Sequence, residues 1–162
     1  MPNSETSSNK LVALSNWLPI SFLILSAIGF IDATYLTTQH FLGTPIACSI
    51  LKGCEEVTTS RYSTIGPVPI SLLGSLYYLT VLILGVIYLD TKKIKALNLL
   101  AKITPLGFLA SAYLVYLQIF VIKAICLYCM GSAVTSTLLF VLSLIFWQKQ
   151  KNSARNKQSS SL

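Results

Sequence analysis

Long apolar runs separated by short polar segments dominate the sequence. Four stretches lack Asp, Glu, Lys and Arg and are long enough to cross a bilayer as helices, which takes about 20 mostly apolar residues. They are residues 11–31, 62–89, 103–122 and 124–148. Gly and Pro at 66–69 should delay the second helix to about Pro69, and Pro105 is tolerable in the first turn of the third. The pattern predicts an all-α membrane protein built as a bundle of four transmembrane helices.

The connection between the first two helices is the longest one. Residues 33–51 also lack those charged residues but contain His40, Gly43 and Pro45, so we interpret them as the end of the first helix followed by a loop. An acidic pair then favours a short surface helix at residues 55–60, because negative charge stabilises a helix N-terminus.

Both chain ends are polar. Residues 1–10 and 149–162 are rich in Ser and Asn, and we expect them to be flexible tails on one four-helix domain at residues 11–148. A cleaved signal peptide is the competing interpretation of residues 1–33. The single Lys and the long apolar run there argue against it.

The composition narrows the class of protein. Hydrophobic residues make up 54% of the 162 residues and charged residues 10%, which excludes a disordered chain and argues against an ordinary soluble domain. The net charge is +7, but the basic residues form short clusters between apolar runs rather than a stripe among exposed aromatics. We therefore expect membrane lipid as a partner and no nucleic acid.

The basic residues also predict an orientation. With four helices, both termini lie on one side of the membrane. That side holds Lys10, Lys92, Lys93, Lys95, Lys102, Lys149, Lys151, Arg155 and Lys157. The other side holds Lys52, Arg61 and Lys123. The excess on the first side predicts cytoplasmic termini, with the loop at residues 41–66 and the Lys123 turn facing outward.

The four cysteines all fall at the predicted outer face, which is the oxidising one. Cys48 and Cys54 lie in the outer loop, and Cys126 and Cys129 lie just past Lys123 at the start of the fourth helix. At 1.5 Å per residue, Cys126 should lie about 4–5 Å beyond Lys123, near the interface, and Cys129 about 9 Å beyond it, in the acyl region. A loop thiol could reach the first and a lipid-soluble molecule the second.

Three interpretations of this cysteine set are open. Count and compartment alone fit two static disulfides as well as a redox relay. A Cys–x–x–Cys motif at a helix start, half buried in lipid, favours redox chemistry, because the helix N-terminus stabilises a thiolate at Cys126. A zinc site with four cysteine ligands is disfavoured by the compartment and by the depth of Cys129, so we expect no metal.

Several motifs together resemble the vitamin K epoxide reductase family in its bacterial and archaeal single-domain form. Their combination is specific, although Cys–x–x–Cys alone is not. They are residues 29–36, Cys48 and Cys54, residues 60–62, the Gly-Pro-Val-Pro stretch at 66–69 ahead of 74–78, and Cys126-Leu127-Tyr128-Cys129. The resemblance covers roughly residues 15–148.

The resemblance implies a four-helix bundle around a quinone of the ubiquinone, menaquinone or phylloquinone type. Carried onto this chain, Cys129 faces the quinone, Cys126 exchanges with Cys54, and Cys48 exchanges with a thioredoxin-fold (DsbA-like) partner. The hydroxyl of Ser60 lies near the quinone and donates a hydrogen bond to it. The implied activity is that of a membrane disulfide-forming oxidoreductase, in a bacterial inner or plasma membrane, with its active site on the outer face.

The sequence departs from the family in two respects. Many bacterial relatives carry a fused thioredoxin-like domain, which this chain lacks, so we expect the partner to act in trans. Vertebrate enzymes bind vitamin K with an Asn and a Tyr where this chain has Ile70 and Ala133. Quinone reduction is therefore expected, and reduction of vitamin K epoxide is in doubt.

Two rival functions have to be weighed. A four-helix oxidase of the DsbB type carries its Cys–x–x–Cys in the first outer loop, whereas here that motif comes second. A non-enzymatic membrane protein with two structural disulfides would keep Cys48–Cys54 and Cys126–Cys129 bonds that never exchange.

Other polar residues in the apolar segments receive structural interpretations. Asp32 should reach water or organise the outer loop through Arg61 or Lys52. His40 is interpreted as an interfacial residue outside the site. Small side chains at Gly131, Ser132 and Ala133 either leave room for a flat ring beside Cys129 or serve helix packing. The tyrosines divide into pocket candidates and interfacial belt residues. The pocket candidates are Tyr77, Tyr78, Tyr113 and Tyr116, and the belt residues are Tyr62 and Tyr88, with Trp147.

Overall fold

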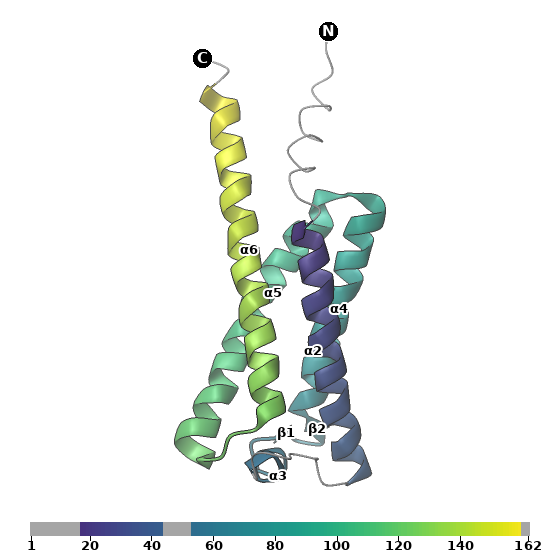
Figure 1. The fold of residues 1–162 in the computed structure, drawn as a ribbon, viewed down its shortest axis with the longest axis vertical. Helices are drawn as coiled ribbons and strands as arrows, with labels where there is room; N and C mark the ends of the chain where they lie inside the picture. Colours follow the sequence, from purple (N-terminus) through teal and green to yellow (C-terminus); the bar gives the residue numbers. More distant parts are fainter. Residues whose placement is uncertain (1–16, 44–52, 160–162) are drawn as a thin grey trace.

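A computed structural model describes residues 17–43 and 53–159 and contains four long helices (Figure 1). They are α2 (Trp17–Leu42), α4 (Ile70–Thr91), α5 (Ile94–Tyr116), which continues as the π-helix η1 (Leu117–Ile122), and α6 (Leu127–Ser159). All four are long and apolar enough to cross a membrane. Contacts of α2 with α4, α4 with α5, α5 with α6 and α6 with α2 close the bundle into a ring. The predicted four-helix all-α fold is confirmed.

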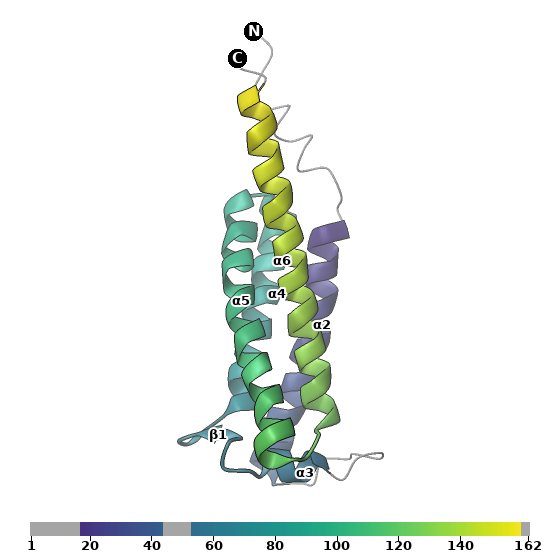
Figure 2. The same ribbon diagram turned by 90° about the vertical axis from the view of Figure 1, so that its left-hand side faces the viewer.

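The two ends of the bundle differ. Helix α2 begins and α6 ends at one end, where α4 also turns into α5 (Figure 1). The short helix α3 (Gly53–Thr58), a hairpin of β1 (Thr64–Ile65) and β2 (Val68–Pro69), and the connector from η1 to α6 lie at the opposite end (Figure 2). The second end therefore carries Cys54, Cys126 and Cys129 together, as the sequence predicts.

The hairpin is the tightest turn in the described chain. Thr64 pairs with Pro69 and Ile65 with Val68 in an antiparallel register. Gly66 takes the turn position with φ +64°, a conformation that favours glycine. Pro69 then occupies the N-cap of α4, so the helix begins where Pro and Gly were expected to allow it.

Several helix boundaries differ from the predicted ones, including the start of α6, which is Leu127 rather than 124. Helix α3 begins at Gly53, two residues early, which puts Cys54 inside its first turn. Helix α5 begins at Ile94 rather than 103, and α6 continues to Ser159 through the expected flexible tail. The predicted spans stop at the first charged residue, but a lysine near a helix end extends its ammonium to water while its backbone stays helical.

Pro105 lies in the interior of α5, not in the first turn as predicted. A proline has no N–H, so the carbonyl four residues earlier, that of Ala101, loses its helical partner. Two hydroxyls replace it: Thr104 donates to the Ala101 carbonyl at 3.1 Å, and Ser143 of α6 donates at 2.9 Å. This exchange satisfies a buried backbone group inside an apolar bundle and joins α5 to α6.

The core occupies the half of the bundle nearer the start of α2. Its fully buried members include Phe22, Val81, Leu100 and Leu139, one from each long helix. Apolar side chains also cover the outside of the bundle. Examples with more than 60% of their surface exposed are Ile31, Phe41, Leu106 and Leu109. An apolar exterior of this kind is what lipid contact requires.

Two tyrosines of α4 fix the helix against both of its neighbours. The ring of Tyr78 lies on Gly29 of α2, and the ring of Tyr77 lies on Gly107 of α5, so closely that a β-carbon at either glycine would overlap the ring. Glycine at these two positions is therefore a requirement of helix packing.

Candidate active site

Cys126 and Cys129 form the inner cysteine pair at the start of α6. Cys126 is the residue before the helix and is fully buried, and Cys129 follows in the first turn, half-buried. The backbone N–H of Cys129 donates to the sulfur of Cys126 at 3.3 Å. A further hydrogen bond from the Cys129 side chain is the main cause that lowers the pKa of Cys126 to about 7, against the opposing effect of burial. The predicted thiolate at Cys126 is thereby supported.

Cys54 lies against this pair. It is fully buried in α3, in a cluster with Val57, Ala124 and Cys126. Among the described cysteines, Cys54 is disulfide-bonded, whereas Cys126 and Cys129 are free thiols. Cys48, the other predicted loop cysteine, lies outside the described residues.

A backbone contact sets the distance between the start of α3 and the connector that precedes α6. A β-carbon at Gly53 would lie 2.8 Å from the carbonyl oxygen of Ile125 and 2.9 Å from its nitrogen, both too close. Gly53 directly precedes Cys54, and Ile125 directly precedes Cys126. The absence of a side chain at Gly53 therefore lets the chain bring these two cysteines into one buried cluster.

A cavity of about 420 Å³ opens beside Cys129, between the helices. Its wall is mostly apolar and draws on all four long helices and on the segment after α3. Lining residues include Leu36, Ile70, Leu114, Cys129, Ser132 and Ser60. This size lies within the range of pockets that hold small organic molecules, which is about 300–1,000 Å³. The cavity can thus accept an apolar ring in reach of the Cys129 sulfur.

Ser60 lies at the cavity as predicted, but its hydroxyl is already engaged. It donates to the Val57 carbonyl at 2.7 Å, and the Ser60 carbonyl accepts from the Ser63 hydroxyl at 2.8 Å. A hydrogen bond from Ser60 to a ligand would need the hydroxyl to turn away from Val57.

The two cavity tyrosines differ in their hydrogen bonds. The Tyr78 hydroxyl bonds to the Ser132 carbonyl at 2.7 Å, to the Ser132 hydroxyl at 3.1 Å and to the Thr135 hydroxyl at 2.8 Å. The Tyr77 hydroxyl is buried and has no partner among the described residues. An unpaired buried hydroxyl is costly, so Tyr77 is the available donor at this wall.

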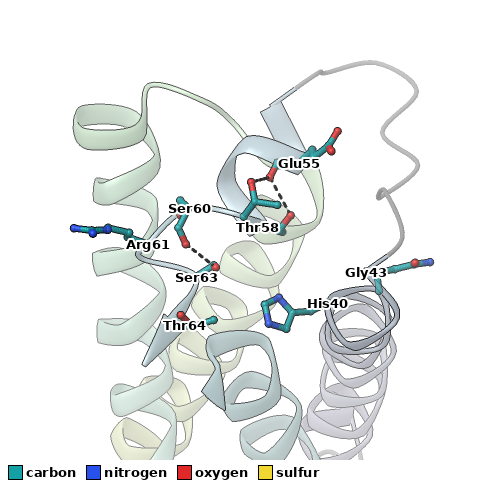
Figure 3. Close-up of a pocket in the computed structure, with 10 residues that line it drawn as sticks. His40, Gly43, Glu55, Thr58, Ser60, Arg61, Ser63 and Thr64 are labelled. Atoms are coloured by element: carbon teal, nitrogen blue, oxygen red, sulfur yellow. Dashed lines mark hydrogen bonds between the residues drawn. The ribbon is translucent and has the colours of Figure 1, made fainter. Parts of the chain in front are cut away.

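A polar pocket of about 480 Å³ adjoins the cavity at the end of the bundle that carries the cysteines (Figure 3). His40 points into it, while Arg61 and Glu55 extend away in different directions (Figure 3). His40, Ser60 and Ser63 line both spaces. His40 therefore lies where the cavity meets the polar end of the bundle, and its exclusion from the reacting residues stays a prediction.

Several other residue predictions need correction. One carboxylate oxygen of Asp32 is buried without a partner among the described residues, and Arg61 is exposed, so that predicted link is not made. Gly131 is exposed and has open space beside it, which leaves Ser132 as the small residue at the cavity. Tyr77, Tyr78 and Tyr113 line the cavity as predicted, and so does the supposed belt residue Tyr62. Tyr116 is exposed and packs on Phe120, and Tyr88 is buried.

Sequence reasoning missed Gln118. This side chain is 3% exposed, accepts a hydrogen bond from the Cys126 N–H at 3.3 Å and lines the cavity. The signal was present, because Gln118 is the only amide side chain in the apolar run at residues 103–122. No group of three or more His, Cys, Asp or Glu side chains within 17–43 and 53–159 is arranged to hold a metal ion.

Comparison with known proteins agrees with this geometry. No individually curated protein matches the chain closely enough to count as a relative. The profile of the vitamin K epoxide reductase family matches residues 20–144, which include parts of all four long helices and the four cysteines. The chain therefore belongs to the vitamin K epoxide reductase family and is an integral membrane oxidoreductase.

Proposed function

We propose that this protein forms disulfides in a thioredoxin-fold partner outside the cytoplasm and passes the electrons to a membrane quinone. The observation that carries the proposal is the contact of Gly53 with Ile125, which brings Cys54 beside Cys126 while Cys129 opens on the cavity. One cysteine pair can then exchange with the other, and the second can reach a ligand in the bundle.

The electrons move by two thiol–disulfide exchanges. A dithiol partner, acting in trans, reduces a Cys48–Cys54 disulfide and leaves as a disulfide. The Cys54 thiolate attacks the sulfur of Cys126 in a Cys126–Cys129 disulfide, and Cys129 leaves as a thiolate. Cys48 then attacks Cys54, which restores the loop disulfide and releases Cys126 as a thiolate. A disulfide-bonded Cys54 beside free thiols at Cys126 and Cys129 supports this order of steps.

The last step returns the inner pair to its disulfide. Two electrons leave Cys126 and Cys129 as their disulfide forms and, with two protons taken up at the site, would convert a quinone to a quinol. The apolar wall, the size of the cavity and the unpaired Tyr77 hydroxyl fit a ring with carbonyl oxygens. The quinone is of the ubiquinone, menaquinone or phylloquinone type, reached from the lipid. The site faces the outer side of a bacterial inner or plasma membrane, and the termini face the cytoplasm.

Anaerobic single-turnover reduction tests the proposal. The purified protein is fully reduced, freed of reductant and mixed with a short-chain ubiquinone while quinol absorbance is followed. We expect about two quinols per protein from the wild type, because the reduced loop pair re-reduces the inner pair once, about one from Cys48→Ala, and none above background from Cys129→Ala. If the wild type forms no quinol, or Cys129→Ala forms as much, the assignment of Cys129 to the acceptor fails.

A trapped bond tests the relay between the pairs. In Cys48→Ala/Cys129→Ala the remaining thiols should form a Cys54–Cys126 disulfide, seen by mass mapping without reduction. Two static structural disulfides predict that this bond does not form, and its absence would favour that non-enzymatic alternative.

A further inference from the structure

Gln118 organises the connector between η1 and α6. Its backbone carbonyl accepts the N–H of Lys123 and, at 3.2 Å, the N–H of Ala124. Its side-chain oxygen accepts the N–H of Cys126 at 3.3 Å. One residue thus binds three of the four N–H groups between residues 123 and 126.

These N–H groups need such a partner. They lie between two helices, where the groups that precede α6 have no acceptor within that helix. Lys123 takes φ +57°, so the chain reverses sharply there and cannot continue the helical ladder. A buried N–H without an acceptor costs free energy comparable to a lost hydrogen bond. Gln118 removes that cost, because its backbone and its side chain both supply acceptors to the connector.

The position of the connector decides what Cys126 faces. The same connector presents the Ile125 backbone to Gly53, and through it places Cys126 in the cluster with Cys54. Ala124 belongs to that cluster as well and is bound through its N–H to Gln118. A shift of the connector would therefore separate the two sulfurs that must exchange.

We propose that Gln118 is a positioning residue for the exchange between Cys54 and Cys126, acting through its side-chain oxygen on the Cys126 N–H. The inference rests on the relay in the proposed function. A displacement of about 1 Å of a reacting group can cost 10²-fold in rate. We therefore expect loss of the acceptor to slow formation of the Cys54–Cys126 bond by about that factor while the bundle remains folded.

The test measures the rate of Cys54–Cys126 bond formation in the Cys48→Ala/Cys129→Ala background. Glutathione disulfide starts the reaction, alkylation stops it, and mass mapping counts the bond. Gln118→Met keeps the volume and removes the acceptor. Gln118→Glu keeps an acceptor oxygen in either protonation state of the carboxyl. Thr104→Val is the matched control, because Thr104 is a buried polar residue of α5 with a local hydrogen bond far from the cysteines.

We expect Gln118→Met to be slowed about 10²-fold, and Gln118→Glu and Thr104→Val to stay within a few-fold of the background protein. Equal slowing in Gln118→Met and Gln118→Glu would assign the effect to packing and overturn the inference, as would an unslowed Gln118→Met. If Gln118→Met does not fold, Gln118→Glu decides: exchange near the background rate supports the inference, and its loss overturns it. If the background protein itself forms no Cys54–Cys126 bond, the relay fails and the inference with it.

Discussion

The two halves of the bundle are built from the same four helices but are filled differently. In the half nearer the start of α2, side chains such as Leu100 and Leu139 are completely buried in one hydrophobic core. In the half nearer the cysteines, the helices enclose a cavity of about 420 Å³. The filled half holds the helices together, and this stability permits the other half to stay hollow around Cys129.

Helix α4 crosses from one half to the other, and its adjacent tyrosines mark the change. Tyr78 belongs to the packed core and has all its hydrogen bonds made within the protein. Tyr77 packs against that core but leaves its hydroxyl unpaired. The comparison teaches that a buried polar group can serve the fold or remain available to a ligand, according to the helix it faces.

The largest effect should come from opening a void in the filled half. Leu100→Ala in the filled half should lower the free energy of unfolding by about 2–5 kcal/mol, since it opens a void among side chains that cannot collapse. Quinol formation by the folded fraction should be unchanged. Denaturation in mixed detergent micelles measures the first quantity and single-turnover absorbance the second.

The matched substitution in the hollow half is Leu114→Trp. Leu114 lines the cavity, so the larger ring should occupy ligand space and reduce quinol formation at least tenfold with little change in stability. Comparable losses of activity in both variants would show that the halves do not divide the work in this way.

A smaller effect is expected from the two tyrosine hydroxyls. Tyr78→Phe removes the hydroxyl that bonds to Ser132 and Thr135, leaving between them only the bond from the Thr135 hydroxyl to the Ser132 carbonyl, and should lower the free energy of unfolding by about 1–3 kcal/mol. Tyr77→Phe removes an unpaired hydroxyl, so stability should hold or rise, while the quinone concentration for half-maximal reduction should increase severalfold. A stability loss in Tyr77→Phe equal to that in Tyr78→Phe would contradict the distinction.

The smallest effect concerns the charge of Asp32. Its carboxylate acts to raise the pKa of Cys126, opposing the hydrogen bond that lowers this pKa to about 7. Removing the charge in Asp32→Asn should favour the thiolate and move the pH midpoint of Cys126 alkylation below 7 by a fraction of a unit. The midpoint is measured from the rate of iodoacetamide labelling at a series of pH values. Cys129→Ala is a control with the opposite sign, because it removes the hydrogen bond that lowers the pKa of Cys126 and should raise the midpoint.

Sequence reasoning recovered what depends on length, order and the membrane. The four spans and the shared end of the three described cysteines follow from the apolar runs and the order of the segments. The full burial of Cys126 was not predicted, because the rise per residue assumed a helix at residues 123–126, where the chain forms a connector. The start of α5 at Ile94 was missed because a charge-free window cannot tell a helix end from the edge of the lipid. The interior position of Pro105 was missed for the same reason, and its cross-helix hydroxyl partner Ser143 is invisible without packing.

The details of the site depend on how each helix is rotated about its axis. Tyr77 and Tyr78 are adjacent and chemically identical in the sequence, yet they face different helices. Gln118 lies in a π-helical segment at the end of the third span, and its side chain bonds to the connector, neither of which a pattern at α-helical spacing predicts. A sequence pattern at helical spacing does not contain that rotation.

The tyrosine–glycine contacts of α4 also bear on how the protein is assembled in the membrane. Each of the four spans is apolar enough to enter lipid as a separate helix, and lipid gives no hydrophobic preference for one neighbour over another. The contacts of Tyr78 with Gly29 and of Tyr77 with Gly107 form after insertion, when the helices meet. These two contacts determine which helices pack against α4 and how α4 is rotated about its axis, so they specify how the bundle assembles.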